Sequence, residues 1–297
     1  IYLRSLQDRN ETLFHAALIE HLEEMAPIVY TPTVGEAVRR FSHIFRSSRG
    51  VYITPDNIAD IDEIFAKRFL REAKLASRVE HPNIVPIRDA GRDDETYYIA
   101  MEFIEGENLG RMCEGKPMQP ARALEIAKQV AAGLNALKNA GVLHRDIKPE
   151  NVIVGKDGVA RITDFGIARE MRSTGRMTET GVGIGSVIYA SPEQIRGTGD
   201  FRSDIYSLGC TLFFMIAGRD PFAPRRSVEQ VVEDKLARPP RTVELPKDVP
   251  DTVRALIRRM IHPRPARRFQ SYEDLSRAMT EALAKRSRPI KDLRRVW

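Results

Sequence analysis

The pattern of apolar and polar positions changes character along this chain. Residues 1–46 carry apolar side chains at helical spacing, and VYIT at 51–54 has the composition of a short strand. Two further β-rich stretches follow, NIVPIRDAG at 83–91 and TYYIAMEF at 96–103, and helical periodicity dominates from Pro120 onward. The pattern therefore predicts an α+β fold with its strands early in the chain and its helices late.

The stretch IFAKRFLREAKL at 64–75 predicts an amphipathic helix with one polar misfit. At about 100° per residue, the apolar stripe consists of Phe65, Phe69, Ala76 and Val79. Glu72 lies within that stripe, where a carboxylate needs a cation. Lys67 is about 140° away around the helix, whereas Arg68 precedes Glu72 by one helical turn. We therefore expect Arg68 to pair with Glu72.

Composition is that of a folded protein, and the charge is concentrated at one end. The chain has 297 residues, of which 42% are hydrophobic, so it can bury a core in two domains or lobes. Its formal net charge is +6, of which residues 282–297 contribute +5, because they hold six Lys or Arg and one Asp. A basic end is usually a solvated one, so no nucleic-acid partner is predicted.

Cysteine usage and hydropathy favour a cytoplasmic protein. Cys113 and Cys210 belong to no CxxC pair, which indicates neither a zinc site nor a disulfide framework and fits a reducing cytosol. The longest apolar run, SLGCTLFFMIAG at 207–218, is interrupted by glycine and is too short to span a bilayer. It predicts a buried core helix, and no membrane partner is expected.

Several short motifs carry candidate chemistry. HRDIKPEN at 144–151 and TDFG at 163–166 supply two acids and an amide on loops beside short strands. Oxygen ligands at this spacing suit Mg²⁺ bound to a polyphosphate, with a further carboxylate for an accepting hydroxyl. SPE at 191–193 and SDIYSLGC at 203–210 follow in order, which makes an ordinary loop an improbable explanation.

With these motifs, residues 66–284 resemble the eukaryotic-type protein kinases, in particular the bacterial serine/threonine kinases. The resemblance implies that Asp146 orients the substrate hydroxyl and accepts its proton, and that Lys148 steadies the transferring phosphate. It also implies that Asn151 and Asp164 hold Mg²⁺. ATP and Mg²⁺ are thus the expected cofactors, and a protein with a Ser or Thr acceptor is the expected substrate.

The same resemblance assigns nucleotide-binding residues to the first lobe. Met101 matches the gatekeeper, and the backbone of Glu102 and Ile104 would receive the adenine edge. Glu72 matches the helix glutamate that pairs with a strand lysine in this family, which is the alternative to its pairing with Arg68.

Further matched positions are structural or regulatory. Glu193 and Arg268 match the buried ion pair that anchors the activation segment, which runs from Phe165 to Ser191. Asp204 matches the residue that holds the catalytic loop, 144–151, from beneath. Ser186 matches a position that contacts the catalytic aspartate. Thr178 and Thr180 are the candidate autophosphorylation sites, with ordinary loop hydroxyls as the equal alternative.

Two features of the family's first lobe are missing from the sequence. Residues 1–66 contain no lysine and no GxGxxG, and GVGIG at 181–185 lies in the activation segment instead. The family's five-stranded sheet would then keep about two strands, 84–88 and 97–103, and one edge would be exposed.

The preceding segment resembles a different family, the malic enzymes. YLRSLQDRNETLF, PIVYTPTVGEA and FSHIFRSSRGVYIT are similar to their N-terminal domain, and Tyr30 matches the general-acid tyrosine. The lysine base, metal ligands and dinucleotide-binding domain of that family have no counterpart here, so no malate chemistry is expected. Because malic-enzyme N-terminal domains contribute to subunit contacts, a homo-oligomer through the N-terminal segment is one option.

These resemblances predict three regions. Residues 1–65 form a mainly helical malic-enzyme-like segment, 66–285 a kinase domain with a partial N-lobe at 66–104 and a C-lobe at 105–285, and 286–297 a basic tail. The predicted function is a serine/threonine protein kinase, impaired by loss of the glycine-rich loop and the lysine. The alternatives are an inactive pseudokinase or scaffold, and a chimeric reading frame that carries a non-functional malic enzyme fragment.

Overall fold

The structure, a computed structural model, consists of two compact units. It describes residues 51–56, 63–93, 96–164, 184–222, 227–236 and 244–286. Within these ranges the first unit comprises residues up to 78 together with 85–104, and the second comprises 79–84 and everything from 105 onward. The helices predicted over 1–46, Tyr30, Thr178 and Thr180 lie outside the described residues.

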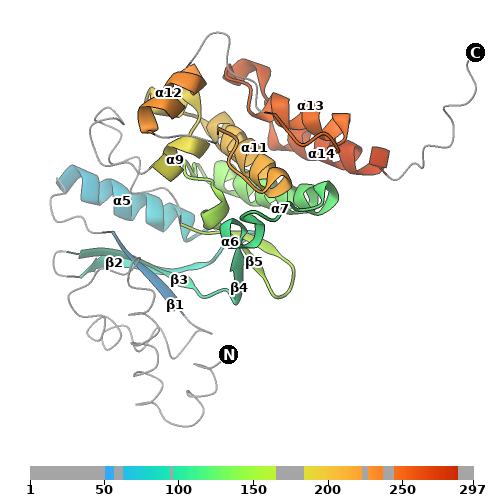
Figure 1. Ribbon diagram of the computed structural model, residues 1–297. Helices are drawn as coiled ribbons and strands as arrows, with labels where there is room; N and C mark the ends of the chain where they lie inside the picture. The colour runs from blue at the N-terminus through green and yellow to red at the C-terminus, as the bar shows by residue number, and fades with distance from the viewer. Residues whose placement is uncertain are drawn as a thin grey trace, which may run out of the picture. The chain divides into compact units, whose positions relative to one another are not determined.

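The first unit is built on an antiparallel sheet of three strands in the order β1-β3-β2 (Figure 1). These are β1 (Val51–Asp56), β2 (Ile87–Asp93) and β3 (Thr96–Glu102). β1 confirms the strand predicted at 51–54 and pairs along the whole of β3, from Val51 opposite Glu102 to Asp56 opposite Tyr97. The prediction of two strands with an exposed edge was therefore wrong, because β1 occupies that edge.

The position of β2 also differs from the prediction of a strand at 84–88. Pro86 lacks an N–H group and cannot take part fully in a ladder, while its carbonyl accepts a hydrogen bond of 2.9 Å from the Glu102 amide. The ladder begins at Ile87 opposite Met101, and its register shifts between Ile87 and Asp89. Ile84 instead forms a parallel bridge with Ile162 in the second unit.

Helix α5 (Glu63–Ala76) confirms the amphipathic helix predicted at 64–75 and contacts β2. Ala73 and Ala76 are 0% and 2% exposed, and Glu72 is half-buried. Val79 was wrongly included in the helical stripe, because α5 ends at Ala76. The side chains of Phe65, Phe69, Lys67 and Arg68 lie outside those that the structure describes, so the Arg68–Glu72 pair stays a prediction.

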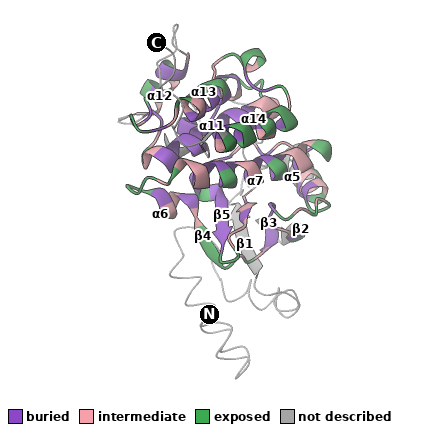
Figure 2. Ribbon diagram, turned by 90° about the vertical axis from the view of Figure 1, so that its right-hand side faces the viewer, coloured by how far each residue is buried: buried purple, intermediate pink, exposed green. Residues whose placement is uncertain are grey.

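The second unit is helical around one central helix, α11 (Phe201–Ala217), which is buried from Ser203 to Ile216 (Figure 2). It packs against α7 (Pro120–Asn139) and α13 (Asp251–Met260), and α14 (Tyr272–Arg286) packs against both of these neighbours. The core helix predicted at 207–218 is thereby confirmed. Among the described helices, none has the length and apolar character to cross a membrane.

A small antiparallel sheet in the order β4-β5-β6 flanks the loop that carries the predicted catalytic residues. Its strands are β4 (Gly106–Asn108), β5 (Val152–Gly155) and β6 (Ala160–Ile162). Gly133 lets α7 pack closely against Asn83 and β6, since a Cβ at this position would lie 2.8 Å from the Asn83 carbonyl oxygen and 2.9 Å from Ile162 Cδ1. The shorter elements of this unit are α6 (Leu109–Cys113), η1 (Pro149–Asn151), α9 (Ile184–Tyr189), α10 (Pro192–Ile195), α12 (Val228–Leu236) and η2 (Pro265–Arg267).

Candidate active site

His144 fixes the start of the loop that joins α7 to β5. Its side chain is fully buried, Nδ1 accepts a hydrogen bond from the Asp146 amide at 3.3 Å, and Nε2 lies 3.1 Å from the Thr163 carbonyl oxygen. Because Nδ1 accepts, Nε2 must carry the proton that is donated to Thr163. Burial lowers the pKa of His144 to about 4. The neutral imidazole therefore ties the loop to the end of β6 and does not act as a base.

Asp204 holds the same loop from α11. Its carboxylate accepts hydrogen bonds from the amides of His144, at 3.0 Å, and Arg145, at 2.7 Å. Burial raises the pKa of Asp204 to about 6, while the two amide donors act in the opposite direction. Arg145 has a left-handed φ of 65°, a strained conformation for a residue with a Cβ. The contact that the sequence predicted for Asp204 is present and stabilises this strained backbone.

Asp146, Lys148 and Asn151 come together at the end of the loop. Asn151 Nδ2 donates to the Asp146 carbonyl oxygen at 2.9 Å and to its Oδ2 at 3.1 Å. Lys148 Nζ lies 3.3 Å from the same Oδ2, and the Asp146 side chain is 15% exposed. An oriented carboxylate that a substrate can still reach, with a cation beside it, is suited to bind a hydroxyl next to an anionic phosphate.

Asp164 directly follows Thr163, the residue that links the end of β6 to Asn151. The Thr163 amide donates to the Asn151 carbonyl at 3.0 Å, and Asp164 has a left-handed φ of 53°. This backbone link brings two of the predicted metal ligands to adjoining segments. An amide oxygen and a carboxylate are the hard donors that Mg²⁺ accepts, usually with water and phosphate completing the shell. Among the described residues there is no cluster of three or more His, Cys, Asp or Glu side chains that could hold a metal ion.

The predicted nucleotide-binding residues Glu72, Met101, Glu102 and Ile104 belong to the first unit. Met101 is 2% exposed within β3. The Glu102 amide donates to the Pro86 carbonyl, and the Glu102 side chain pairs with Arg88. The catalytic loop belongs to the second unit, so a nucleotide site that combines both sets stays a prediction.

The ion pair predicted between Glu193 and Arg268 is confirmed. Arg268 Nη1 and Nη2 lie 2.5 and 2.8 Å from the two carboxylate oxygens of Glu193, and the Arg268 side chain is completely buried. Ser203 Oγ adds a hydrogen bond of 2.8 Å to Glu193. This pair fixes α10, the helix that closes the activation segment. Ser186 lies in α9, but its side chain is outside the described ones.

Gln194 also contacts the catalytic loop, which sequence reasoning missed. Its Nε2 donates to the Arg145 carbonyl at 2.9 Å, while its Oε1 accepts from the Ser191 amide at 2.9 Å. The second bond belongs to a capping box, because Ser191 Oγ in turn accepts from the Gln194 amide at 3.2 Å. The SPEQ pattern is a recognisable signal for such a box. The bond to Arg145 has no local signal.

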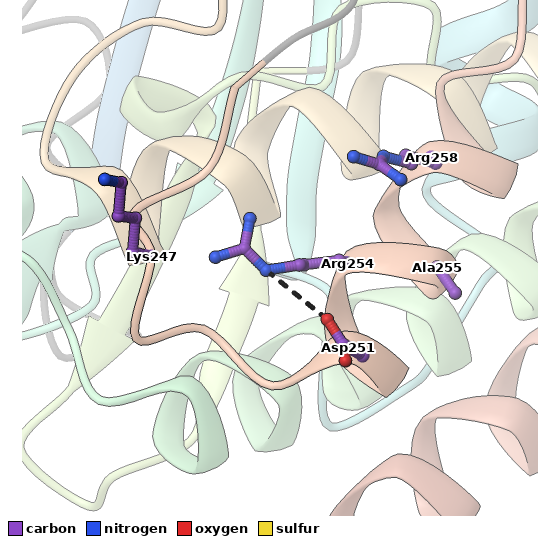
Figure 3. A pocket seen from close by; sticks show the side chains of 5 residues that line it. All are labelled: Lys247, Asp251, Arg254, Ala255 and Arg258. Carbon is purple, nitrogen blue, oxygen red and sulfur yellow. Dashed lines mark ion pairs between the residues drawn. The ribbon is translucent and has the colours of Figure 1, made fainter.

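A basic hollow of about 540 Å³ lies beside α13, lined by Lys247, Asp251, Arg254, Ala255 and Arg258 (Figure 3). The guanidinium of Arg254 hydrogen-bonds to backbone carbonyls of the loop that precedes α13. Its Nε lies 2.9 Å from the Val249 carbonyl oxygen, and its Nη1 lies 3.2 Å from that of Leu245. Arg254 thus stabilises the entry into α13, and none of the predicted catalytic residues lines this hollow.

Comparison with known families agrees with this geometry. Residues 53–283 match the family model of the protein kinase domain. The chain belongs to the protein kinase family. It is similar to the serine/threonine-protein kinase PrkC of Bacillus subtilis, with 38% identity over 216 residues that cover 72% of this chain and 33% of that protein. It is also similar to PknD of Mycobacterium tuberculosis, with 39% identity over 226 residues that cover 74% of this chain and 33% of the relative.

The chain therefore spans about a third of the length of these relatives. Among solved structures it resembles the kinase domain of Mycobacterium tuberculosis PknI. One crystal structure of that domain has a TM-score of 0.61 and 26% identity, and the match covers 80% of this chain and 87% of that one. Another has a TM-score of 0.58 and 27% identity, covering 80% and 87%.

A second family model also matches the chain. Residues 7–83 match the malic enzyme, N-terminal domain. The two matches overlap over 53–83, which includes most of β1 and all of α5. The predicted boundary at residue 65 falls within this overlap and stays a prediction.

Proposed function

We propose that this chain is a serine/threonine protein kinase that transfers the γ-phosphate of ATP to a Ser or Thr hydroxyl of a protein substrate. The cluster of Asp146, Lys148 and Asn151, fixed from beneath by Asp204, carries the proposal. Membership in the kinase family and the names of the serine/threonine kinases to which the chain is similar support it.

In the proposed reaction Asp146 accepts a hydrogen bond from the substrate hydroxyl and takes its proton as the new O–P bond forms. The bond between the γ-phosphorus and the β,γ-bridging oxygen breaks, and ADP leaves with that electron pair. Asn151 holds the Asp146 carboxylate in one orientation through its Nδ2 donor. Lys148, 3.3 Å from Asp146 Oδ2, is placed to offset negative charge on the transferring phosphate.

Asn151 and Asp164 are the residues that would hold Mg²⁺. When bound, this ion would supply positive charge that offsets the negative charge developing on the transferring phosphate. The protein contributes the orientation of the two ligands, since Thr163 joins their segments through its amide.

Phosphate transfer to a generic basic protein tests the proposal. With radiolabelled ATP and Mg²⁺ we expect incorporation into Ser or Thr, and we expect Asp146→Asn to lower the rate by about 10²- to 10⁴-fold. Asp157→Asn, a change of the same chemistry at an exposed turn, is the matched control. Equal incorporation by the wild type and the Asp146 variant would remove the kinase assignment.

One observation favours a second function, that of a pseudokinase or scaffold. β1 covers the edge of β3 at 51–56, which is 16 to 21 residues before Glu72, where the family's lysine strand is expected. Its sequence VYITPD contains no lysine. A shift of the melting temperature by Mg-ATP separates the alternatives, because a kinase that binds its substrate is stabilised by it and an empty scaffold is not.

The predicted regions are proposed with it: a malic-enzyme-like segment at 1–65, a kinase domain at 66–285 and a basic tail at 286–297. The two family matches support separate origins for the first two regions. A single transcript that spans the codons for residues 60–70 would exclude the alternative of a chimeric reading frame. A homo-oligomer through the first segment is tested by the mass of the protein in solution.

A further inference from the structure

Side chains from two neighbouring helices bind the consecutive carbonyls of residues 188–190. Lys235 Nζ on α12 donates to Ile188 O at 2.6 Å and to Ala190 O at 2.5 Å. Ser207 Oγ on α11 donates to Tyr189 O at 2.9 Å, between the two lysine bonds. α9, which ends in this segment, contacts both helices (Figure 1). The backbone leading into the Ser191 capping box is thus fixed at every residue.

Lys235 does this from inside the protein. It is 3% exposed, and its Nζ lies 4.9 Å from the centre of the Tyr206 ring and 4.7 Å from that of Phe222. Removing an ammonium group from water is costly unless hydrogen bonds and π-faces replace the water. The two carbonyls and two rings make that replacement here. The position would be better filled by an apolar residue if packing were its purpose.

Gln194 links the segment 188–190 to the catalytic loop. Ala190 precedes Ser191, whose capping box contains Gln194, and Gln194 Nε2 binds the Arg145 carbonyl at 2.9 Å. Arg145 is the strained residue next to Asp146, and Asp204 holds its amide. The loop is therefore held on one side by α11 and on the other by α10, which the Glu193–Arg268 pair anchors and whose N-terminus directly follows the carbonyls that Lys235 binds.

We propose that Lys235 is a positioning residue for Asp146, acting through Ala190, Gln194 and Arg145. This rests on the proposed kinase function. Lys235 touches no reacting group. A displacement of about 1 Å at a reacting carboxylate lowers a rate by up to about 100-fold, so loss of Lys235 should reduce turnover more than nucleotide binding.

Lys235→Met removes the charge and both donors while keeping the length of the side chain. We expect kcat for phosphate transfer to fall by about 10- to 100-fold with the KM for ATP within about twofold of the wild type. Lys235→Arg keeps a cationic donor and should recover part of the rate. Lys247→Met, at an exposed lysine of the same unit, is the matched control and should behave as the wild type.

A double-mutant cycle distinguishes this path from a general loss of structure. Gln194→Glu keeps an acceptor for the Ser191 amide but loses the donor to Arg145. If Lys235 acts through Gln194, the double variant should be no slower than the slower single variant. The proposal is overturned if the rate reductions of the two single variants multiply in the double variant, or if kcat is unchanged in Lys235→Met.

Hydrogen exchange gives a readout that needs no activity. In Lys235→Met we expect faster exchange at the amides of His144 and Arg145, and an unchanged rate in α14, which is not part of this path. Exchange that rises equally throughout the second unit would contradict a positioning role. If the wild type transfers no phosphate, the proposed function fails, and the exchange data still decide whether Lys235 fixes the loop.

Discussion

Glu193 and Arg268 form a buried, two-pronged ion pair that joins residues 75 positions apart in the sequence. The same guanidinium donates to three backbone carbonyls, those of Arg202, His262 and Pro263, and lies 4.8 Å from the centre of the Tyr206 ring. Each donor of this buried cation therefore has an acceptor. The pair connects α10, the start of α11 and the segment after α13, which are the elements around the catalytic loop.

Removal of the Arg268 charge should destabilise the second unit strongly. Arg268→Met leaves the Glu193 carboxylate buried without its cation, with Ser203 as a remaining side-chain donor, and breaking one partner of a buried pair costs about 3–5 kcal/mol. Urea unfolding measures this loss. Arg258→Met, at an exposed arginine of α13, is the control and should change the free energy of unfolding by less than about 0.5 kcal/mol. A loss for Arg268→Met as small as the control's would contradict a structural role for the pair.

The contribution of Glu193 should depend on pH. Burial by itself would raise the pKa of this carboxyl, but the hydrogen bonds and charge of Arg268 outweigh burial and hold the pKa below its usual value. Such a group stabilises the fold above its unfolded-state pKa, about 4.3, and loses this contribution as the pH falls through its folded-state pKa. The difference in unfolding free energy between the wild type and Glu193→Gln should therefore shrink as the pH falls from about 6 to below about 4.3. A difference that stays constant over this range would refute the assignment.

Asp204→Asn tests how the catalytic loop is held. The amide side chain offers one acceptor oxygen where the carboxylate offers two, so one of the His144 and Arg145 amides loses its partner. A buried donor left unsatisfied costs about 1–3 kcal/mol. We expect that loss in urea unfolding and a fall in kcat, because the strained Arg145 backbone relaxes. Asp248→Asn at an exposed position serves as the control. Full activity in the Asp204 variant would show that the loop keeps its shape without this carboxylate.

Gly133→Ala should destabilise the contact between α7 and β6. The added Cβ would meet the Asn83 carbonyl oxygen at 2.8 Å, and this oxygen already accepts a hydrogen bond of 2.9 Å from the Ile162 amide. Overpacking of this kind costs about 1–3 kcal/mol, which exceeds the roughly 1 kcal/mol that alanine gains over glycine within a helix. Thermal unfolding measures the net effect, with Ala132→Ser on the exposed face of α7 as the control. A raised melting temperature would mean that the helix can shift to make room.

The sequence by itself predicted the candidate catalytic motifs and the main helices. The motif at 144–151 named Asp146, Lys148 and Asn151, which the structure brings together, because a loop of eight residues fixes its members near one another. The apolar run at 207–218 identified the core helix α11, since only burial accommodates such a run. The Glu193–Arg268 pair came from family resemblance, as no local pattern links residues so far apart.

Only the tertiary structure decided which distant segments pair. β1 covers the edge of β3, although VYITPD has no sequence signal that names its partner, because strand pairing depends on backbone groups that all residues share. The link from Lys235 through Gln194 to Arg145 was equally hidden. A lysine in an amphipathic helix is normally solvated, and its burial here follows from carbonyls and aromatic rings contributed by three other segments of the chain. Residues that are neighbours in the sequence determine the local chemical groups, whereas the rest of the fold determines which side chains are buried and how the strands pair.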